Sequence, residues 1–107
     1  MLLTQDQEMI RDAVRAFAQE ELWPQAARWD KEHHFPRDAH QGLAALGAYG
    51  ICVPEDLGGA GLDYLSLALV LEEIAAGDGG TSTAISVTNC PVNAILMRYG
   101  NARQQRD

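Results

Sequence analysis

The nineteen residues 79–97 contain no charged side chain, which makes them the most constraining stretch of this sequence. A helix of that length can span a lipid bilayer. Eight of the residues, however, are polar or proline and disfavour transfer into lipid: Thr81, Ser82, Thr83, Ser86, Thr88, Asn89, Pro91 and Asn93. We therefore expect no membrane span, and instead a helix that is buried against other protein and lines a cavity.

The composition describes one globular domain over residues 1–107. Apolar side chains make up 47% of the chain, enough for one hydrophobic core. The formal charge of −7 repels nucleic-acid phosphates and anionic membrane surfaces, so neither is an expected partner. The opening residues lack a signal-peptide pattern, which favours the cytoplasm. Cys52 and Cys90 are not spaced as a zinc or redox motif, and we expect two reduced, buried thiols.

Helical patterns cover most of the chain. Thr4 and Gln7 form a capping-box pattern, and apolar residues then recur at helical spacing until Pro24 ends the first helix. A second, short helix is expected over residues 25–34. A third follows and ends at Gly47 in the left-handed conformation.

The middle of the chain predicts a change of structure and then two more helices. Residues 49–54 predict a short extended segment, and the three glycines among residues 58–61 predict a loop. Asp63 is the candidate N-cap of a fourth helix. Thr81 is the candidate N-cap of a fifth, which Pro91 should kink because its ring removes a backbone donor.

The last residues begin one more helix. Asn101 and Gln104 repeat the capping pattern, but the chain ends three residues later. Because a helix of about two turns is not stable by itself, we expect these residues to be the amino-terminal piece of a longer polypeptide.

Residue types and spacing identify no catalytic or metal-binding set. The glycine clusters lack both the third glycine of a dinucleotide fingerprint and the Gly-Lys-Ser/Thr of a phosphate loop. Asp30 and His34 share a helical face, but nothing completes a ligand set, so no metal is expected. Glu72 and Glu73 are adjacent, point in different directions and are expected to be solvated.

Ser82, Ser86 and Asn89 are the polar residues that we consider as a candidate site. Their spacing of four and then three residues places them on one face of the uncharged helix. Such hydroxyls often bond to the preceding helical turn and do nothing more. The alternative is that they line a ligand pocket.

The glycine-rich loop also carries a recognisable motif. Residues 53–64 read Val53-Pro54-Glu55-Asp56-Leu57-Gly58-Gly59-Ala60-Gly61-Leu62-Asp63-Tyr64, and Glu72-Glu73-Ile74-Ala75 follows. Further matches are Leu3-Thr4 with Gln7, Phe35-Pro36, Leu46-Gly47, Gly50-Ile51 and Tyr99-Gly100. Together these residues resemble the acyl-CoA dehydrogenase family, most closely its short-chain members, over essentially the whole chain.

This resemblance implies an all-α, up-and-down helical bundle, the amino-terminal domain of the family fold. The central β-domain and the carboxy-terminal helical domain of the family are then absent. Family members use FAD to convert acyl-CoA thioesters to trans-2-enoyl-CoA, pass the electrons to electron-transfer flavoprotein and usually form homotetramers. Their catalytic base and most FAD contacts lie in the other two domains. We therefore expect no catalytic residue here, no activity of this chain alone and no retained FAD.

The resemblance also assigns the helix that matches residues 81–91 to the wall of the acyl-chain pocket. Ser82, Ser86, Asn89 and Pro91 are thus the candidate substrate-binding residues. Pro91 departs from the apolar residue expected in a short-chain member, and a kink there would change the depth of the pocket. Two alternatives stay open: an acyl-CoA oxidase of the same superfamily, and a stand-alone helical interaction module without catalysis.

Overall fold

The computed structural model describes residues 2–106, and no β-strand occurs among them. The α-helices are α1 (Gln5–Phe17), α2 (Ala26–Glu32), α3 (Arg37–Ala45), α4 (Tyr64–Gly77), α5 (Gly79–Val87), α6 (Ala94–Tyr99) and α7 (Ala102–Arg106). The shorter pieces are the π-helical η1 (Ala18–Leu22) and η4 (Thr88–Asn93) and the 3-10 helices η2 (Ala48–Gly50) and η3 (Glu55–Leu57). The all-α prediction is confirmed.

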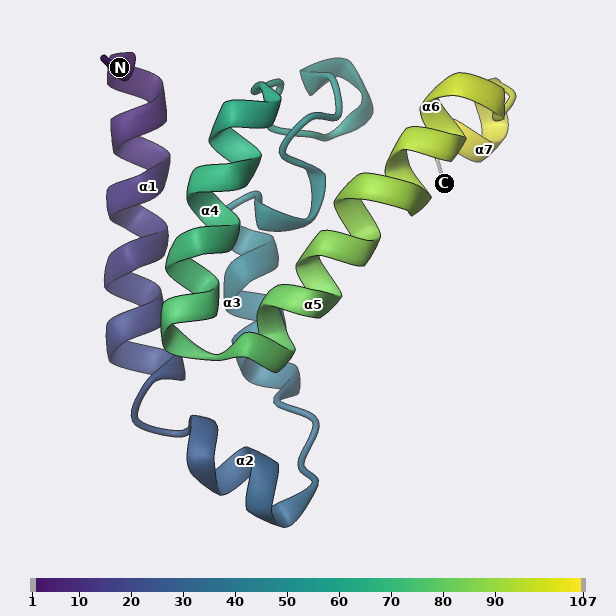
Figure 1. Cartoon of the computed structure of the whole chain (residues 1–107). Coiled ribbons are helices and arrows are strands. Elements are labelled where there is room, and N and C mark those ends of the chain that lie inside the picture. The colour runs from purple at the N-terminus through teal and green to yellow at the C-terminus, as the bar shows by residue number, and fades with distance from the viewer. Residues whose placement is uncertain (1, 107) are drawn as a thin grey trace.

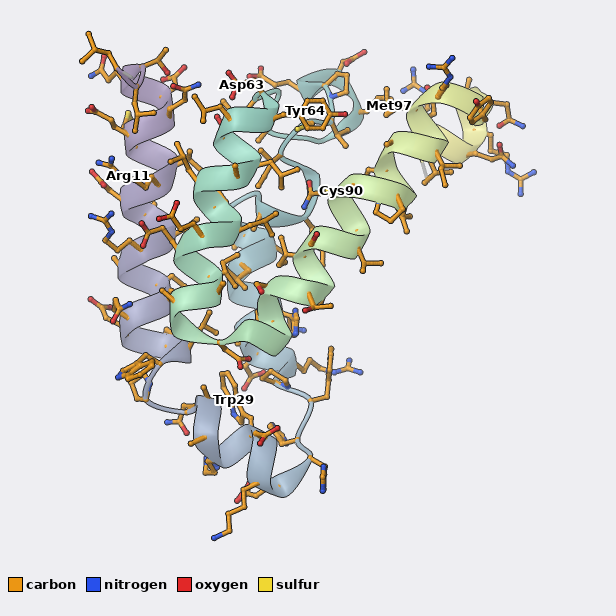
Figure 2. All side chains as sticks on the ribbon, viewed as in Figure 1. Arg11, Trp29, Asp63, Tyr64, Cys90 and Met97 are labelled. Atoms are coloured by element: carbon orange, nitrogen blue, oxygen red, sulfur yellow. The ribbon has the colours of Figure 1, made fainter. Side chains whose placement is uncertain are left out.

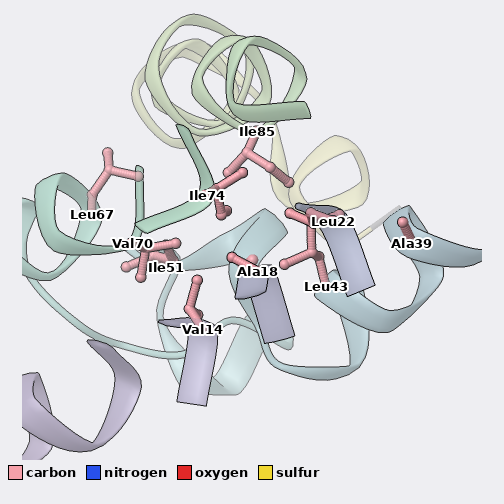
Figure 3. Close-up of a cluster of buried hydrophobic side chains, with 11 residues drawn as sticks. Val14, Ala18, Leu22, Ala39, Leu43, Ile51, Leu67, Val70, Ile74 and Ile85 are labelled. Carbon is pink, nitrogen blue, oxygen red and sulfur yellow. The ribbon is translucent and has the colours of Figure 1, made fainter. Parts of the chain in front are cut away.

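The helices α1, α3, α4 and α5 form an up-and-down bundle (Figure 1). The chain descends in α1, rises in α3, descends in α4 beside α1 and rises again in α5. Their apolar faces meet in one core (Figure 3). The buried apolar residues are Val14, Ala18, Leu22, Ala39, Leu43, Ala48, Ile51, Leu67, Val70, Ile74 and Ile85.

The first helix follows its sequence pattern closely. Thr4 Oγ1 accepts from the Gln7 backbone N–H at 3.2 Å, and Gln7 Oε1 accepts from the Thr4 N–H at 2.9 Å, so the predicted capping box is present. At four-residue spacing, Val14, Ala18 and Leu22 are fully buried. They face α4 where it ends at Gly77: a Cβ there would lie 2.9 Å from the Ala18 carbonyl oxygen. Glycine therefore allows the two backbones to approach.

The connection between α3 and α4 is only partly as predicted. Gly47 has a φ of 83°, so the left-handed stop is confirmed. The extended segment predicted for residues 49–54 is wrong, because η2 and tight turns occupy this region. The following loop folds back onto these turns, with the Ala60 N–H donating to the Gly50 carbonyl at 2.9 Å and the Leu62 N–H to the Ile51 carbonyl at 2.8 Å. These bonds satisfy backbone groups that a strand partner would otherwise have to satisfy.

The start of α5 also corrects the sequence analysis. The predicted cap residue Thr81 lies inside the helix, and Asp78 is the N-cap, its carboxylate accepting from the Thr81 N–H at 3.2 Å. Asp63 caps α4 as predicted, accepting from the Ser66 N–H at 2.9 Å. The chain remains helical through Pro91, which lies in the π-helical turn η4. A π-turn is one of the ways in which a helix accommodates an inserted irregularity.

Three further features bear on function. Both cysteines are free, but Cys90 is exposed and Cys52 half-buried, so the prediction of two buried thiols is wrong. Within residues 2–106, no helix is long and apolar enough to cross a lipid bilayer. No group of three or more His, Cys, Asp or Glu side chains in the same range is arranged to hold a metal ion.

Candidate functional site

The four predicted site residues lie on one continuous helical rod formed by α5, η4 and α6 (Figure 1). Ser82 and Ser86 are half-buried, Asn89 is buried and Pro91 is exposed. The rod leans away from α4 towards its carboxyl end, so residues along it face different parts of the protein. The structure accordingly divides the four residues between separate environments.

Ser82 and Ser86 share a cavity of about 410 Å³. Its lining residues are Leu71, Glu72 and Ala75 of α4 and Ser82, Thr83, Ser86 and Val87 of α5. The Ser82 hydroxyl donates to the Gly79 carbonyl at 2.8 Å, the local bond that is common for serines in helices. The Ser86 hydroxyl has no such bond among the described residues. The Ser86 hydroxyl and the Glu72 carboxylate are therefore the polar groups of this cavity that can contact a ligand.

Thr83 and Val87 are two residues of this cavity that the sequence analysis did not select. They follow Ser82 and Ser86 directly, so the same four-residue spacing brings all four side chains to one helix face. The only signal for Val87 in the sequence was an apolar side chain directly after Ser86 in the uncharged run. A search for polar residues alone could not find it.

Asn89 has a structural role, unlike the two serines. Its amide nitrogen donates to the Ala48 carbonyl at 2.8 Å and to the Ile85 carbonyl at 3.0 Å, and its oxygen accepts from the Ile51 N–H at 3.0 Å. Nearby, Asn93 donates to the Tyr49 carbonyl at 2.8 Å. The two asparagines thus fasten the turn after α3 to the rod, and both donor hydrogens of Asn89 are already used.

A second cavity, of about 420 Å³, lies between this turn and α6. Tyr64 and Met97 approach it from opposite sides (Figure 2), and Cys52, Asn89, Asn93 and Arg98 also line it. Burial, with smaller contributions from Asp63 and Cys90, raises the pKa of the Cys52 thiol. The thiol is therefore protonated near neutral pH and is a poor nucleophile. Pro91 lines neither this cavity nor the one at Ser86.

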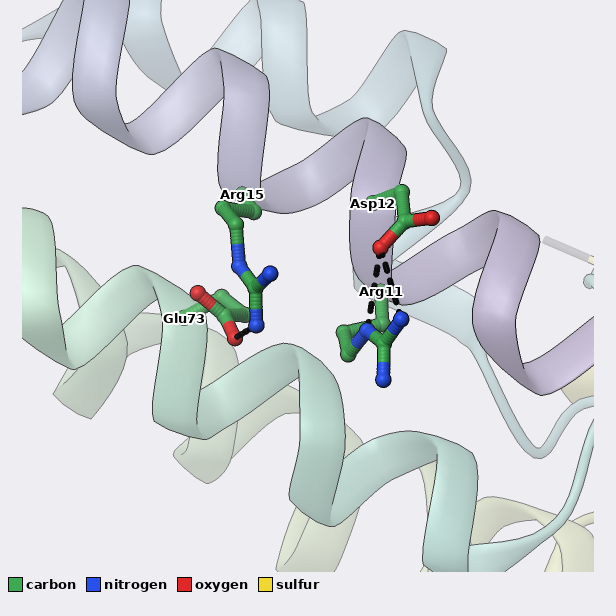
Figure 4. A network of polar contacts seen from close by, with 4 residues as sticks. All are labelled: Arg11, Asp12, Arg15 and Glu73. Atoms are coloured by element: carbon green, nitrogen blue, oxygen red, sulfur yellow. Dashed lines mark hydrogen bonds and ion pairs between the residues drawn. The ribbon is translucent and has the colours of Figure 1, made fainter. Parts of the chain in front are cut away.

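The paired carboxylates do not form a catalytic site. Glu73 is bound to Arg15 of α1 across a distance of 2.8 Å (Figure 4), and this hydrogen bond raises the pKa of Arg15. Beside it, Arg11 pairs with its own neighbour Asp12. Glu72 points instead to the cavity at Ser86. The two glutamates thus diverge, as their adjacency in the helix predicts. The prediction that both are solvated is wrong for Glu73, whose side chain is only 12% exposed.

The glycine-rich loop is not built to hold a nucleotide phosphate. Its backbone N–H groups are used within the loop: Gly59 donates to Pro54 at 3.1 Å, Ala60 to Gly50 at 2.9 Å and Gly61 to Val53 at 2.9 Å. A Cβ at position 59 would lie only 2.1 Å from the Val53 oxygen, so this glycine serves close packing. The amides of Gly59, Ala60 and Gly61 are therefore not free to cradle a phosphate of a dinucleotide such as FAD.

The sequence matches known proteins over nearly its whole length. Residues 4–107 match the model of the acyl-CoA dehydrogenase amino-terminal domain. The short-chain specific acyl-CoA dehydrogenase of Rattus norvegicus is 39% identical over 104 residues, which are 97% of this chain and 25% of that protein. The isobutyryl-CoA dehydrogenase of Dictyostelium discoideum is 40% identical over 104 residues, again 97% of this chain and 25% of that protein.

Solved structures show the same arrangement of helices. A chain from a structure of the electron transferring flavoprotein of Acidaminococcus fermentans superposes with a TM-score of 0.93 at 35% identity, covering 99% of this chain and 28% of that one. Butyryl-CoA dehydrogenase from Megasphaera elsdenii gives a TM-score of 0.91 at 26% identity, with the same coverage of 99% and 28%. This chain thus spans about a quarter of the length of the relatives that it matches. With a family model that covers nearly all of it, the chain belongs to the acyl-CoA dehydrogenase family and corresponds to the amino-terminal domain.

Proposed function

We propose that this chain supplies part of the acyl-chain pocket of an FAD-dependent acyl-CoA dehydrogenase and has no activity alone. One observation carries the proposal: the cavity at Ser86 lies on an uncharged helix in a domain whose relatives are named for acyl-CoA substrates. Leu71, Ala75 and Val87 form the apolar part of this cavity, beside Glu72 and three residues with hydroxyl groups. Such a surface can exclude water from a saturated carbon chain.

The proposed role is binding and not chemistry. In the complete enzyme, FAD would accept the hydride and a carboxylate of another domain would remove the α-proton. Glu73 is paired with Arg15 and the amides of the glycine-rich loop are bonded internally, so we assign neither of these roles to them. The contribution of α5 would be to place the acyl chain and to limit its length.

The proposal extends to partners and assembly. The substrate would be a short acyl-CoA, consistent with the names of the short-chain and butyryl-CoA relatives. Electron-transfer flavoprotein would accept the electrons, and the complete enzyme would form a homotetramer. A cytoplasmic location rests on the sequence pattern of the first residues alone. The domain boundaries, with residues 1–107 as one domain, also stay a prediction.

A chimera tests the proposal directly. Residues 4–107 would replace the matching segment of the rat short-chain enzyme, and oxidation of butyryl-CoA and octanoyl-CoA would be followed with an artificial electron acceptor. We expect a flavin-containing enzyme that oxidises butyryl-CoA. Ser86→Leu should fill part of the cavity and raise the KM for the longer thioester by roughly 10-fold more than that for butyryl-CoA.

Met9→Leu on the exposed face of α1 is the matched control, since it also places a leucine on a helix but far from the cavity. It should leave both KM values unchanged. A chimera that retains FAD yet responds identically to the Ser86 and Met9 variants would show that the cavity does not hold the acyl chain.

A further inference from the structure

Another cavity, of about 310 Å³, lies where α2 and the segment that follows it meet α3 and the start of α5. It shares no lining residue with the cavities at Ser86 and at Met97. Trp29 lines this cavity and packs against the hydrophobic core, on the side of α2 that is nearer to the bundle (Figure 2). A ligand bound here would therefore be separate from the proposed acyl chain.

His40 places a buried polar group at this cavity. The residue is 8% exposed, its Nδ1 is hydrogen-bonded to the Tyr49 hydroxyl, and the Phe35 ring stacks on it. Its Nε2 has no hydrogen-bond partner in the described part of the chain, where every fully buried side-chain nitrogen or oxygen has one. The small exposed part of His40 therefore includes Nε2, which opens on the cavity that the ring lines. Since the Tyr49 O–H has no other acceptor among residues 2–106, we assign the ring proton to Nε2, which can donate it to a ligand.

The charges that line the cavity are negative. Apart from three histidines, its ionisable side chains are the carboxylates of Asp30 and Asp78, and no lysine or arginine lines it. Asp78 Oδ2 accepts from the backbone N–H and the hydroxyl of Thr81, whereas Oδ1 accepts no hydrogen bond from the described residues. The rings of Trp29 and Phe35 add aromatic faces. Carboxylates beside aromatic rings favour a cation over an anion.

We propose that this cavity binds a small alkylammonium ion that carries an oxygen acceptor, of about the size of choline. The ammonium group lies against Trp29 and Phe35, with its charge beside Asp30 and Asp78, and its oxygen accepts from His40 Nε2. The volume of about 310 Å³ is at the lower end of the range for small-molecule sites, which suits an ion of this size. The inference does not depend on the proposed acyl pocket, because the two cavities have no residue in common.

A pair of ligands tests the charge preference. Isothermal titration calorimetry at about pH 8, where an ordinary imidazole is neutral, compares choline with its uncharged analogue in which carbon replaces the nitrogen. Both have the same shape and the same hydroxyl group. We expect the 107-residue chain to bind choline at least about 10-fold more tightly than the analogue, because only the cation gains from the carboxylates and aromatic faces. Equal affinities, or no binding of choline below about 10 mM, would overturn the proposal.

Matched variants test the location of the site. Asp78→Asn keeps a side chain that can cap α5 but removes its charge, and Asp63→Asn makes the same change at the N-cap of α4. Trp29→Leu removes the aromatic face, and Trp23→Leu is its control at a 64% exposed position. The Asp78 and Trp29 variants should each weaken choline binding by roughly 5-fold or more, and the two controls should leave it unchanged. Far-UV circular dichroism checks that each variant is folded.

The chimera with the rat enzyme extends the test to a chain that includes the other domains. Choline should bind it with a similar dissociation constant and should not raise the KM for butyryl-CoA, since the two cavities share no residue. Loss of binding in the chimera would mean that the other domains close the cavity, and would overturn the proposal. Binding that is insensitive to both Asp78→Asn and Trp29→Leu would overturn it as well.

Discussion

At the scale of single residues, Asn89 is the side chain whose role the structure changes most. As a buried amide it binds three backbone groups, two of them in the turn that follows α3. In Asn89→Asp, two donor hydrogens are lost and a carboxylate faces the carbonyls of Ala48 and Ile85. We expect the free energy of unfolding to fall by about 2–4 kcal/mol, because buried acceptors lose their partners and a charge is buried.

Urea denaturation measures this loss. Asn93→Asp serves as the control, since Asn93 is half-buried and donates one hydrogen bond, to the Tyr49 carbonyl. The free energy of unfolding should fall clearly less in Asn93→Asp than in Asn89→Asp. If the two aspartate variants were equally stable, the turn after α3 would not depend on Asn89.

His40 should make stability depend on pH. Its ring is buried under the stacked Phe35 ring, with centroids 4.8 Å apart, and its Nδ1 is hydrogen-bonded to the Tyr49 hydroxyl. Burial lowers the pKa of His40 below its ordinary value of 6.5, and Asp78 opposes this shift. The folded state therefore binds fewer protons than the unfolded state, so stability is complete above pH 6.5 and is lost as the pH falls below it.

Urea midpoints between pH 8 and pH 5 test this dependence. His40→Gln should remove part of the slope below pH 6.5, the ordinary pKa of the ring. His33→Gln changes an exposed histidine and should leave that slope in place. A profile that is the same in all three proteins would mean that His40 does not titrate differently on folding.

At the scale of elements, the surroundings of two glycines predict opposite effects on stability when each is replaced by alanine. Gly59→Ala would bring a Cβ to 2.1 Å from the Val53 oxygen, so the loop must move. Gly79→Ala meets no atom within 4 Å at the start of α5. We expect the first to destabilise the fold by about 2 kcal/mol or more and the second to stabilise it by roughly 0.5–1 kcal/mol. Thermal and urea unfolding of both variants would show the difference, and a neutral Gly59→Ala would contradict the packing described for the loop.

The elements also show where sequence patterns succeed and fail. The first helix, its capping box, the stop at Gly47 and the cap at Asp63 all depend on residues a few positions apart, and these were predictable. The N-cap of α5 is Asp78 and not Thr81. Both residue types can cap a helix, and which of them does so here depends on the residue at which α4 ends. The 3-10 turn at Ala48 depends on Asn89, which is far away in sequence. Long-range contacts of this kind leave no local signal.

The candidate site illustrates the same limit. The spacing of residues in the sequence predicts which face of a helix they share. It does not predict which other element packs against that face at each position along the helix. Ser86 faces α4, whereas Asn89, less than one turn further on, faces the turn after α3. The polar stripe was therefore correctly placed on a helix, but its members meet different partners. Only the packing of the rod against the bundle separates them.

At the scale of the whole molecule, the fold predicts that this chain does not bind FAD by itself. The amides of the glycine-rich loop are bonded internally, and the cavities at Ser86 and at Met97, of about 410 and 420 Å³, share no lining residue. A flavin dinucleotide needs a continuous site with groups that bind its phosphates. Flavin fluorescence during titration with the 107-residue chain should show no binding tighter than about 100 μM. The chimera with the rat enzyme is the positive control, because there the other domains are present. Tight binding by the chain alone would show that an amino-terminal domain can hold the cofactor without them, and the division of labour proposed for this protein would then have to be abandoned.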